Sequence, residues 1–310
     1  MDKSNNQKKG RPRQKWNPHW SLKLIYGLWS AALTVLKIAV GAAATVLLIC
    51  VVCGFVFVGI LGNYLQDDVL PEAYYNMENA NLDQTSFVYY VDEDGHIQLL
   101  QQIHTSADRQ WASLDEIPEA MVEAAIAIED KRFYEHQGVD WITTVKACAN
   151  LFFGGDDKFG GSTITQQLLK NLTGEDSVTV QRKVQEILTA QCYEKLYDKD
   201  YIMEWYLNTI YLGRGCYGVK SAAAEYFGKE LRTLTIAECA SLISITNNPS
   251  IFNPYSQSVY MWEGQERNGA ERNRYRQLSV LGEMHTQGWI TDEEYEEAKN
   301  QALAWLDELL

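Results

Sequence analysis

A run of 24 residues without one charged side chain, 38–61, constrains this chain more than any other feature. As a helix that rises about 1.5 Å per residue, the run is ~36 Å long, which is enough to cross a hydrocarbon core of about 30 Å. Buried core helices are seldom this long. A secretory signal would have a shorter apolar run followed by a small-residue cleavage site. We therefore predict a transmembrane helix at 38–61.

The charges on the two sides of this run are unequal. Residues 1–37 contain eight Lys or Arg and a single acid, Asp2, whereas residues 62–310 contain 19 basic and 40 acidic residues, a net charge of −21. The positive-inside rule therefore predicts that the basic tail 1–37 is cytoplasmic and that about 249 residues lie on the outer face. A globular part this acidic is a poor partner for nucleic acid, because phosphate backbones need a basic surface.

The six cysteines give no sign of a metal site. Cys50 and Cys53 lie inside the apolar run, and the other four are scattered: Cys148, Cys192, Cys216 and Cys239. No CxxC pair is followed by a second pair at zinc spacing. An outer location permits disulfides, but four isolated cysteines do not require them. We expect them to be small buried residues.

Beyond the run, the pattern predicts a stalk at 62–85, one domain at 86–303 and a tail at 304–310. Apolar segments 87–91 and 97–100 flank the acidic turn 92–95, which is typical of a β-hairpin. The rest is predicted to be helical. The expected helices are 119–129, 141–153, one from Thr163, 179–196, 199–208, 219–226, 236–244, 271–286 and one capped by Thr291 and Glu294.

The first of three polar clusters that could carry chemistry is Glu129-Asp130, at the end of the apolar helix 119–129. Adjacent carboxylates there face the negative end of the helix dipole. That electrostatic setting suits a general base. Taken alone, however, a solvated helix end explains the pair better.

The second cluster surrounds the expected helix start at Thr163. Glycines that precede a helix N-terminus expose backbone N–H groups to an anion. Gln166 and Lys170 are four residues apart and share a helix face. Such donors suit a phosphate and sugar hydroxyls, although an ordinary capped helix is the simpler reading.

The third cluster is Arg182-Lys183-x-x-Glu186. Arg182 and Glu186 form an i, i+4 pair, and a structural ion pair of this kind contributes only ~0.3–0.5 kcal/mol at a surface. Each cluster is ambiguous by itself, and only their order along the chain is specific.

In this order the clusters resemble the motifs of the peptidoglycan glycosyltransferase family (glycosyltransferase family 51). This is the polymerising module of class A penicillin-binding proteins and of monofunctional transglycosylases. The similarity extends from about Thr85 to Leu303. The matching blocks are Glu129-Asp130-x-x-Phe133-x-x-His136-x-Gly138, Gly161-Ser-Thr-Ile-Thr-Gln-Gln-x-x-Lys170-Asn171, Arg182-Lys183-x-x-Glu186, Glu204-x-Tyr206-Leu207-Asn208 and Ala224-x-Tyr226-Phe227-Gly228-Lys229. The resemblance implies a mainly α, lysozyme-like glycosyltransferase domain with a small β-hairpin.

The resemblance also implies roles for individual residues. Glu129 would be the general base that deprotonates the 4-hydroxyl of the acceptor GlcNAc. Glu186 would be a second essential carboxylate near the donor diphosphate, acting directly or through a divalent cation such as Mg or Mn; no other cofactor is required. The implied substrate-binding residues are Asp130, Phe133, His136, Ser162, Thr163, Gln166, Gln167, Lys170, Asn171, Arg182 and Lys183.

The implied reaction is inverting polymerisation of lipid-linked disaccharide-peptide (lipid II) into β-1,4 glycan with release of polyprenyl diphosphate. Fixed cations at Lys170, Arg182 and Lys183 would stabilise the charge of the leaving diphosphate. Many members carry a further basic residue at the position of Val178, so neutralisation would rest more heavily on Lys170 and Arg182. The implied partners are the precursor, the growing strand, membrane lipid and other cell-wall synthesis or division proteins.

Two rival functions remain. A lytic transglycosylase or muramidase shares the lysozyme-like architecture, but it needs a catalytic acid and no cationic diphosphate pocket. An inactive cell-wall scaffold would not need to retain both Glu129 and Glu186. The Ser-x-x-Lys and Lys-Thr-Gly motifs of a transpeptidase are not found. The sequence therefore fits either a monofunctional polymerase or the first half of a longer gene product.

The segment Leu151-Phe152-Phe153 places large apolar side chains just before Gly154-Gly155 and next to the second cluster. Either these aromatic residues end a helix in the core, or they dip into the bilayer beside a lipid-linked substrate. We predict the second arrangement.

Overall fold

The computed structural model describes residues 18–64, 82, 85–91, 96–103, 107–146, 161–174, 180–262 and 264–309. The chain divides into two compact units, Met1–Asp67 and Asp68–Leu310.

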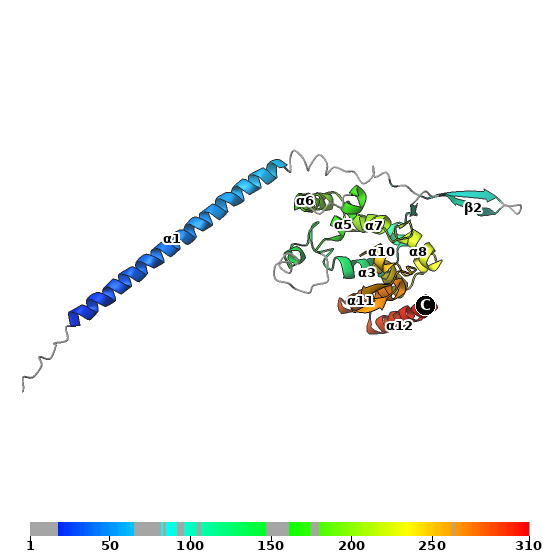
Figure 1. Cartoon of the computed structure of the whole chain (residues 1–310). Coiled ribbons are helices and arrows are strands. Elements are labelled where there is room, and N and C mark those ends of the chain that lie inside the picture. The colour runs from blue at the N-terminus through cyan, green and yellow to red at the C-terminus, as the bar shows by residue number, and fades with distance from the viewer. Residues whose placement is uncertain are drawn as a thin grey trace, which may run out of the picture. The chain divides into compact units, whose positions relative to one another are not determined.

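The first unit contains one long helix, α1 (Pro18–Tyr64), drawn in blue in Figure 1. It includes the predicted span 38–61 but begins at Pro18, because Lys37 interrupts the uncharged run without interrupting the helix. Its part from Leu22 to Tyr64 is long and apolar enough to cross a membrane by length and composition. The hydroxyls of Thr34 and Thr45 donate to carbonyls four residues earlier, so these polar groups are satisfied within the helix.

The second unit is mainly helical with small β elements, which confirms the predicted fold class. Where the structure describes the expected helices, their ends lie within two residues of prediction; residues 141–146 are helical, and the rest of the expected 141–153 helix lies outside the described residues. The elements are η3 (Leu114–Glu116), α3 (Glu119–Glu129), α5 (Ile164–Thr173), α6 (Val180–Leu196), α7 (Lys199–Thr209), α8 (Val219–Phe227), η4 (Leu231–Thr233), α9 (Ile236–Ile245), α10 (Pro249–Phe252), α11 (Gly269–Thr286) and α12 (Asp292–Leu309).

Six strands form three two-stranded sheets in the described residues. The predicted hairpin is present as β1 (Ser86–Val91) paired antiparallel with β2 (Ile97–Ile103), with a bulge after Val88; its turn 92–95 lies outside the described residues. The sequence did not predict the parallel pair β3 (Asp108–Arg109) and β4 (Cys216–Tyr217), or the hairpin β5 (Tyr260–Trp262) and β6 (Gln265–Arg267). Strands of two or three residues are too short to show an alternating pattern.

The core around the site is built by α3, α9 and α11, which pack against one another. The apolar face of α3 is rich in alanine, and Ala124, Ala125 and Ala127 are completely buried. Small side chains there let α9 and α11 approach closely, and Leu242, Val280 and Leu281 fill the interface. The end of α3 is thereby held against two helices that come more than 100 residues later in the chain.

Side-chain caps explain where the helices of this core begin. Thr163, Thr235 and Asn268 each cap a helix and form a capping box with the residue three positions later. Asn268 starts α11 at Gly269, two residues before the predicted start. Thr291 and Glu294 form the same reciprocal hydrogen bonds at the start of α12, as predicted.

Gly138 allows the first motif block to touch α6. It has a φ of +78°, and a Cβ built on it would lie 2.5 Å from the carbonyl carbon of Ala190. A left-handed backbone without a side chain is therefore required at this contact. The glycine of the first block brings that block against the helix that carries the third.

Three cysteines of the second unit are described, and none of them is in a disulfide. Cys216 and Cys239 are buried, as expected, whereas Cys192 is half-buried. Burial raises the pKa of the Cys216 thiol to about 12, so this thiol is unreactive at neutral pH. Cys148 lies outside the described residues.

Candidate active site

Glu129, the last residue of α3, is surrounded by hydrogen-bond donors from three other parts of the fold. Its Oε2 accepts from Nε2 of Gln167 on α5 at 3.0 Å, and its Oε1 accepts from Oγ1 of Thr246 at 3.0 Å. Arg276 on α11 brings Nη2 to 3.5 Å from Oε1. The side chain is 13% exposed. Glu129 is therefore an oriented carboxylate that keeps access to solvent, as a general base requires.

The amide of Gln167 is oriented by Tyr206 on α7. The Tyr206 hydroxyl donates to Oε1 of Gln167 at 3.3 Å, which turns the Gln167 NH₂ group toward Glu129. Complete burial, together with the charge of Glu129, raises the pKa of Tyr206 well above its ordinary value. The phenol therefore stays protonated and remains a donor. Gln167, predicted to bind substrate, supports the carboxylate in this structure.

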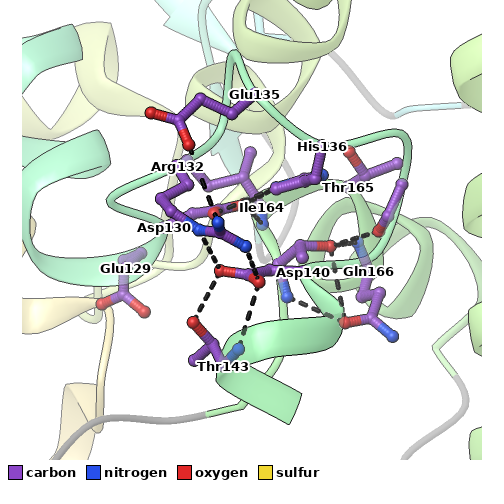
Figure 2. A network of polar contacts seen from close by, with 12 residues as sticks. Glu129, Asp130, Arg132, Glu135, His136, Asp140, Thr143, Ile164, Thr165 and Gln166 are labelled. Carbon is purple, nitrogen blue, oxygen red and sulfur yellow. Dashed lines mark hydrogen bonds and ion pairs between the residues drawn. The ribbon is translucent and has the colours of Figure 1, made fainter. Parts of the chain in front are cut away.

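Asp130 lies next to Glu129 in sequence but has a different environment. Figure 2 shows its carboxylate within a polar network, while Glu129 lies to one side. Oδ2 of Asp130 accepts from the backbone N–H of Ile164 at 3.0 Å, and Nε2 of His136 lies 2.9 Å away. Asp130 thus caps the N-terminus of α5, where a negative charge is favourable.

His136 and Phe133 are buried behind Asp130. Nδ1 of His136 lies 4.0 Å from Oε1 of Glu194, and the other oxygen of Glu194, Oε2, pairs with Nζ of Lys199 at 2.7 Å. The Lys199 ammonium lies 4.3 Å from the ring centroid of Phe133. The side chains of Asp130, Phe133 and His136, for which the resemblance implies a substrate contact, are buried here. They hold α3, α5, α6 and α7 together.

An Arg132–Asp140 pair stabilises the segment after α3 (Figure 2). Asp140 also accepts from the backbone N–H groups of Ile142 and Thr143 and from the Thr143 hydroxyl, so it caps helix 141–146. Burial opposes ionisation, but the hydrogen bonds from Arg132 and Thr143 outweigh it and lower the pKa of Asp140 well below its ordinary value. Nothing in the sequence marks this pair, because helix caps leave no catalytic signature.

Thr163 and Gln166 form the capping box at the start of α5. Gln166 Oε1 accepts from the Thr163 N–H at 2.8 Å, and the Thr163 hydroxyl donates to the carbonyl of Gly138 at 2.7 Å. Both side chains are buried and build the helix start, while the resemblance implies that they also line the donor site. Lys170 and Asn171 lie on the same helix and are exposed, as a substrate contact requires.

The predicted cationic cluster is assembled around Glu186 on α6. Lys183 Nζ donates to Glu186 Oε1 at 2.5 Å and to the Ser162 hydroxyl at 2.8 Å, and Arg182 Nη2 lies 3.6 Å from Glu186 Oε2. The cluster therefore extends from the start of α5 to α6. With two cations and one carboxylate, its net charge is positive.

This donor set does not make a divalent-cation site by itself. No group of three or more His, Cys, Asp or Glu side chains with metal-binding geometry occurs among the described residues. Glu186 is a single carboxylate already paired with Arg182 and Lys183. A hard cation would need several more oxygen ligands.

The fourth block supports the segment that leads into α3. Glu204 accepts from Nε1 of Trp111 at 3.0 Å and from the N–H of Leu114 at 2.9 Å. The Asn208 side chain accepts from the N–H of Ala112 and donates to its carbonyl. In the fifth block, the Tyr226 hydroxyl donates to the carbonyl of Leu212. Apart from Tyr206, which orients Gln167, these residues connect neighbouring segments of the fold.

Sequence reasoning missed Thr246 and Arg276, the two residues that contact Oε1 of Glu129. Thr246 follows α9 directly, and Arg276 is one of several arginines on α11. Neither lies in a motif block. Only the packing of α9 and α11 on α3 brings them to the carboxylate.

Comparison with known proteins shows which families this sequence matches. The family model "Transglycosylase" matches residues 96–285, and the model "Short C-terminal domain" matches residues 276–303. The chain is 42% identical over 195 residues to penicillin-binding protein 1A of Aquifex aeolicus, covering 63% of this chain and 25% of that protein. It is 33% identical over 252 residues to penicillin-binding protein 1F of Bacillus subtilis, and this match covers 81% of this chain and 31% of that protein. For penicillin-binding protein 1A of Escherichia coli the identity is 42% over 192 residues, and this match covers 62% of this chain and 21% of that protein.

The chain therefore spans less than a third of the length of these relatives. The transglycosylase match extends over more than half of the chain, and it contains Glu129, Gln167, Glu186 and Arg276. The chain belongs to the transglycosylase family, as the order of its motif blocks predicted.

Proposed function

We propose that this chain is a membrane-anchored peptidoglycan glycosyltransferase that polymerises lipid-linked disaccharide-peptide into β-1,4 glycan. The observation that carries the proposal is that residues at the start of α5 contact both the carboxylate of Glu129 and the cationic cluster. Gln167 of α5 donates to the carboxylate of Glu129, and Ser162, five residues earlier, accepts from Lys183 in the cationic cluster. The proposed base and the cationic cluster are thereby connected through the start of α5.

Each group would serve one end of the reaction. Glu129 takes the proton of the acceptor 4-hydroxyl, and the acceptor oxygen attacks the anomeric carbon of the donor as the bond to the diphosphate breaks, with inversion. Arg182, Lys183 and Lys170 stabilise the charge that develops on the leaving diphosphate. Glu186 orients Arg182 and Lys183.

In this proposal the side chains provide the neutralising charge, and no metal-bound step is needed. The described residues around Glu186 do not form a divalent-cation site alone. A Mg or Mn ion would take most of its ligands from the diphosphate oxygens and water.

The length and composition of α1 support membrane anchoring, and a lipid-linked substrate would be consistent with it. We propose that α1 crosses the membrane once, with the basic tail 1–37 in the cytoplasm and the second unit on the outer face. Trp141, Ile142 and Val145 are large apolar residues exposed on helix 141–146, and they suit contact with a lipid surface. Other cell-wall synthesis or division proteins are further proposed partners.

The deciding experiment is incubation of the purified full chain with fluorescent lipid-linked disaccharide-peptide, followed by gel separation. Slow-migrating polymer that is missing with Glu129→Gln supports the proposal. A parallel incubation with preformed glycan identifies a lytic enzyme, because shorter fragments would then appear. No change in either substrate would point to an inactive scaffold.

A further inference from the structure

Arg276 is the charged partner of Glu129. Its Nη2 lies 3.5 Å from Oε1, and its guanidinium carbon lies 5.5 Å from the ring centroid of Phe252. The side chain is 18% exposed. Burial lowers the pKa of Arg276 below its ordinary value, while the charge and hydrogen bond of Glu129 oppose this shift. A guanidinium is effectively always charged, so a cation is held beside the carboxylate.

The two oxygens of Glu129 are not equivalent. A carboxylate has about four acceptor positions, two on each oxygen. Among the described residues, Oε1 accepts hydrogen bonds from Thr246 and Arg276, whereas Oε2 accepts a hydrogen bond only from Gln167. Oε2 therefore retains an acceptor position for one more hydroxyl.

We infer that Arg276 is a positioning residue that places a positive charge against Oε1 of Glu129 and turns the carboxylate so that Oε2 is the oxygen that receives the acceptor's proton. The inference rests on the proposed glycosyl transfer. The O–H bond of the acceptor breaks, a new O–H bond forms at Oε2, and the electron pair left on the acceptor oxygen forms the new glycosidic bond. Arg276 and Thr246 stay on Oε1 throughout.

The groups that face Glu129 in the described structure come from every element packed around it. Arg276 on α11 is positive, Tyr206 on α7 is a protonated phenol, and Gln167 and Thr246 are neutral donors. Asp130, the next residue, is negative and paired with His136. Removing the charge of Arg276 would thus leave a nearby acid as the main charged influence on Glu129. The protonated form of Glu129 would then persist to higher pH.

The test is a pH–rate profile of polymerisation for wild type, Arg276→Met and Arg276→Lys. We expect the acid limb of Arg276→Met to move up by about 1–3 pH units, because a cation within 4–6 Å is lost. We expect kcat to fall, while KM for the lipid-linked donor stays within about twofold of wild type. The reason is that the substitution removes an interaction of the reacting carboxylate and leaves the groups that bind the donor unchanged. Arg276→Lys should keep the wild-type limb and lose part of kcat, because a lysine keeps the charge but not the planar geometry. Arg232→Met is the matched control, since Arg232 pairs with Asp115 at 3.4 Å on the exposed surface.

A second readout separates this inference from the proposed function. The Glu129 carboxyl signal is followed by ¹³C NMR in protein labelled at glutamate, assigned by its loss in Glu129→Gln. Its titration midpoint should rise in Arg276→Met, whether or not the protein makes polymer. Polymer formation with an unmoved midpoint and acid limb would overturn the inference alone, whereas a moved midpoint without polymer would overturn only the proposed function. If Arg276→Met fails to fold, as judged by circular dichroism, Arg276→Lys and Arg276→Gln decide by the same two readouts.

Discussion

The guanidinium of Arg276 lies 3.5 Å from the carboxylate of Glu129, although 147 residues separate the two in the sequence. The first belongs to α11 and the second ends α3, and the two helices are packed together by buried apolar side chains. The charge environment of the proposed base is therefore a property of the helical core.

The first prediction concerns Glu129. Replacement by Gln keeps the shape and removes the proton acceptor, so polymerisation should fall by ~10²–10⁴-fold while the thermal unfolding midpoint changes little. The measurement is the initial rate on lipid-linked substrate. Glu135→Gln, at a 68% exposed side chain, is the control and should be unaffected. More than about a tenth of the wild-type rate in Glu129→Gln would contradict the assignment.

The second prediction concerns the leaving group. Lys170 is exposed on α5, and Lys170→Ala should impair donor use severely, because a fixed cation near the diphosphate is lost. Val178 lies outside the described residues, and Val178→Arg should be neutral or improve donor use. Steady-state kinetics on the lipid-linked donor test both variants, with Lys195→Ala near the end of α6 as the control. An unimpaired Lys170→Ala enzyme would mean that the diphosphate is bound elsewhere.

The third prediction is a pH dependence of stability. Because the folded structure lowers the pKa of Asp140 below 3.8, its ordinary value, its ionised form stabilises the fold above that pH. The contribution is lost as pH falls through that value toward the folded pKa. Asp140→Asn should therefore lower the urea midpoint at pH 7 and lower it by less as the pH falls below about 4. A constant difference between pH 7 and pH 3 would argue against this account.

The fourth prediction concerns Gly138. Gly138→Ala places a Cβ 2.5 Å from the backbone of Ala190 at a φ of +78°, and should reduce the free energy of unfolding by more than about 1 kcal/mol. Gly282→Ala in α11 is the matched control, because a Cβ there meets nothing within 4 Å. That change should stabilise the protein by about 0.5–1 kcal/mol. Urea denaturation measures the free energy of unfolding of both variants. Equal changes would show that the close approach of Gly138 to Ala190 does not explain the destabilisation.

The fifth prediction concerns Phe152 and Phe153, which lie outside the described residues. If they dip into the bilayer, each contributes ~1.5–3 kcal/mol to membrane attachment. A chain that starts at Leu65 should float with liposomes, and Phe152→Ser with Phe153→Ser should release it without unfolding it. Equal flotation of both proteins would assign these side chains to the core.

Local patterns in the sequence determined the elements and the family. Helix caps such as Thr163 and Thr235 act within four residues, so the helix starts could be predicted from short-range chemistry alone. The uncharged run 38–61 predicted a long apolar helix because length and composition are local properties. The ordered blocks around Glu129 and Glu186 indicated the transglycosylase family before any geometry was known.

Tertiary structure alone decided what the residues of those blocks do. Glu129 and Asp130 are adjacent, yet one faces Gln167 and Arg276 while the other caps α5 and pairs with His136. Buried residues such as Phe133 and exposed residues such as Lys170 cannot be told apart within a motif block. Arg276 reaches Glu129 only because α11 packs on α3. Motif spacing records which residues occur together, but the orientation of a side chain depends on contacts between elements far apart in sequence.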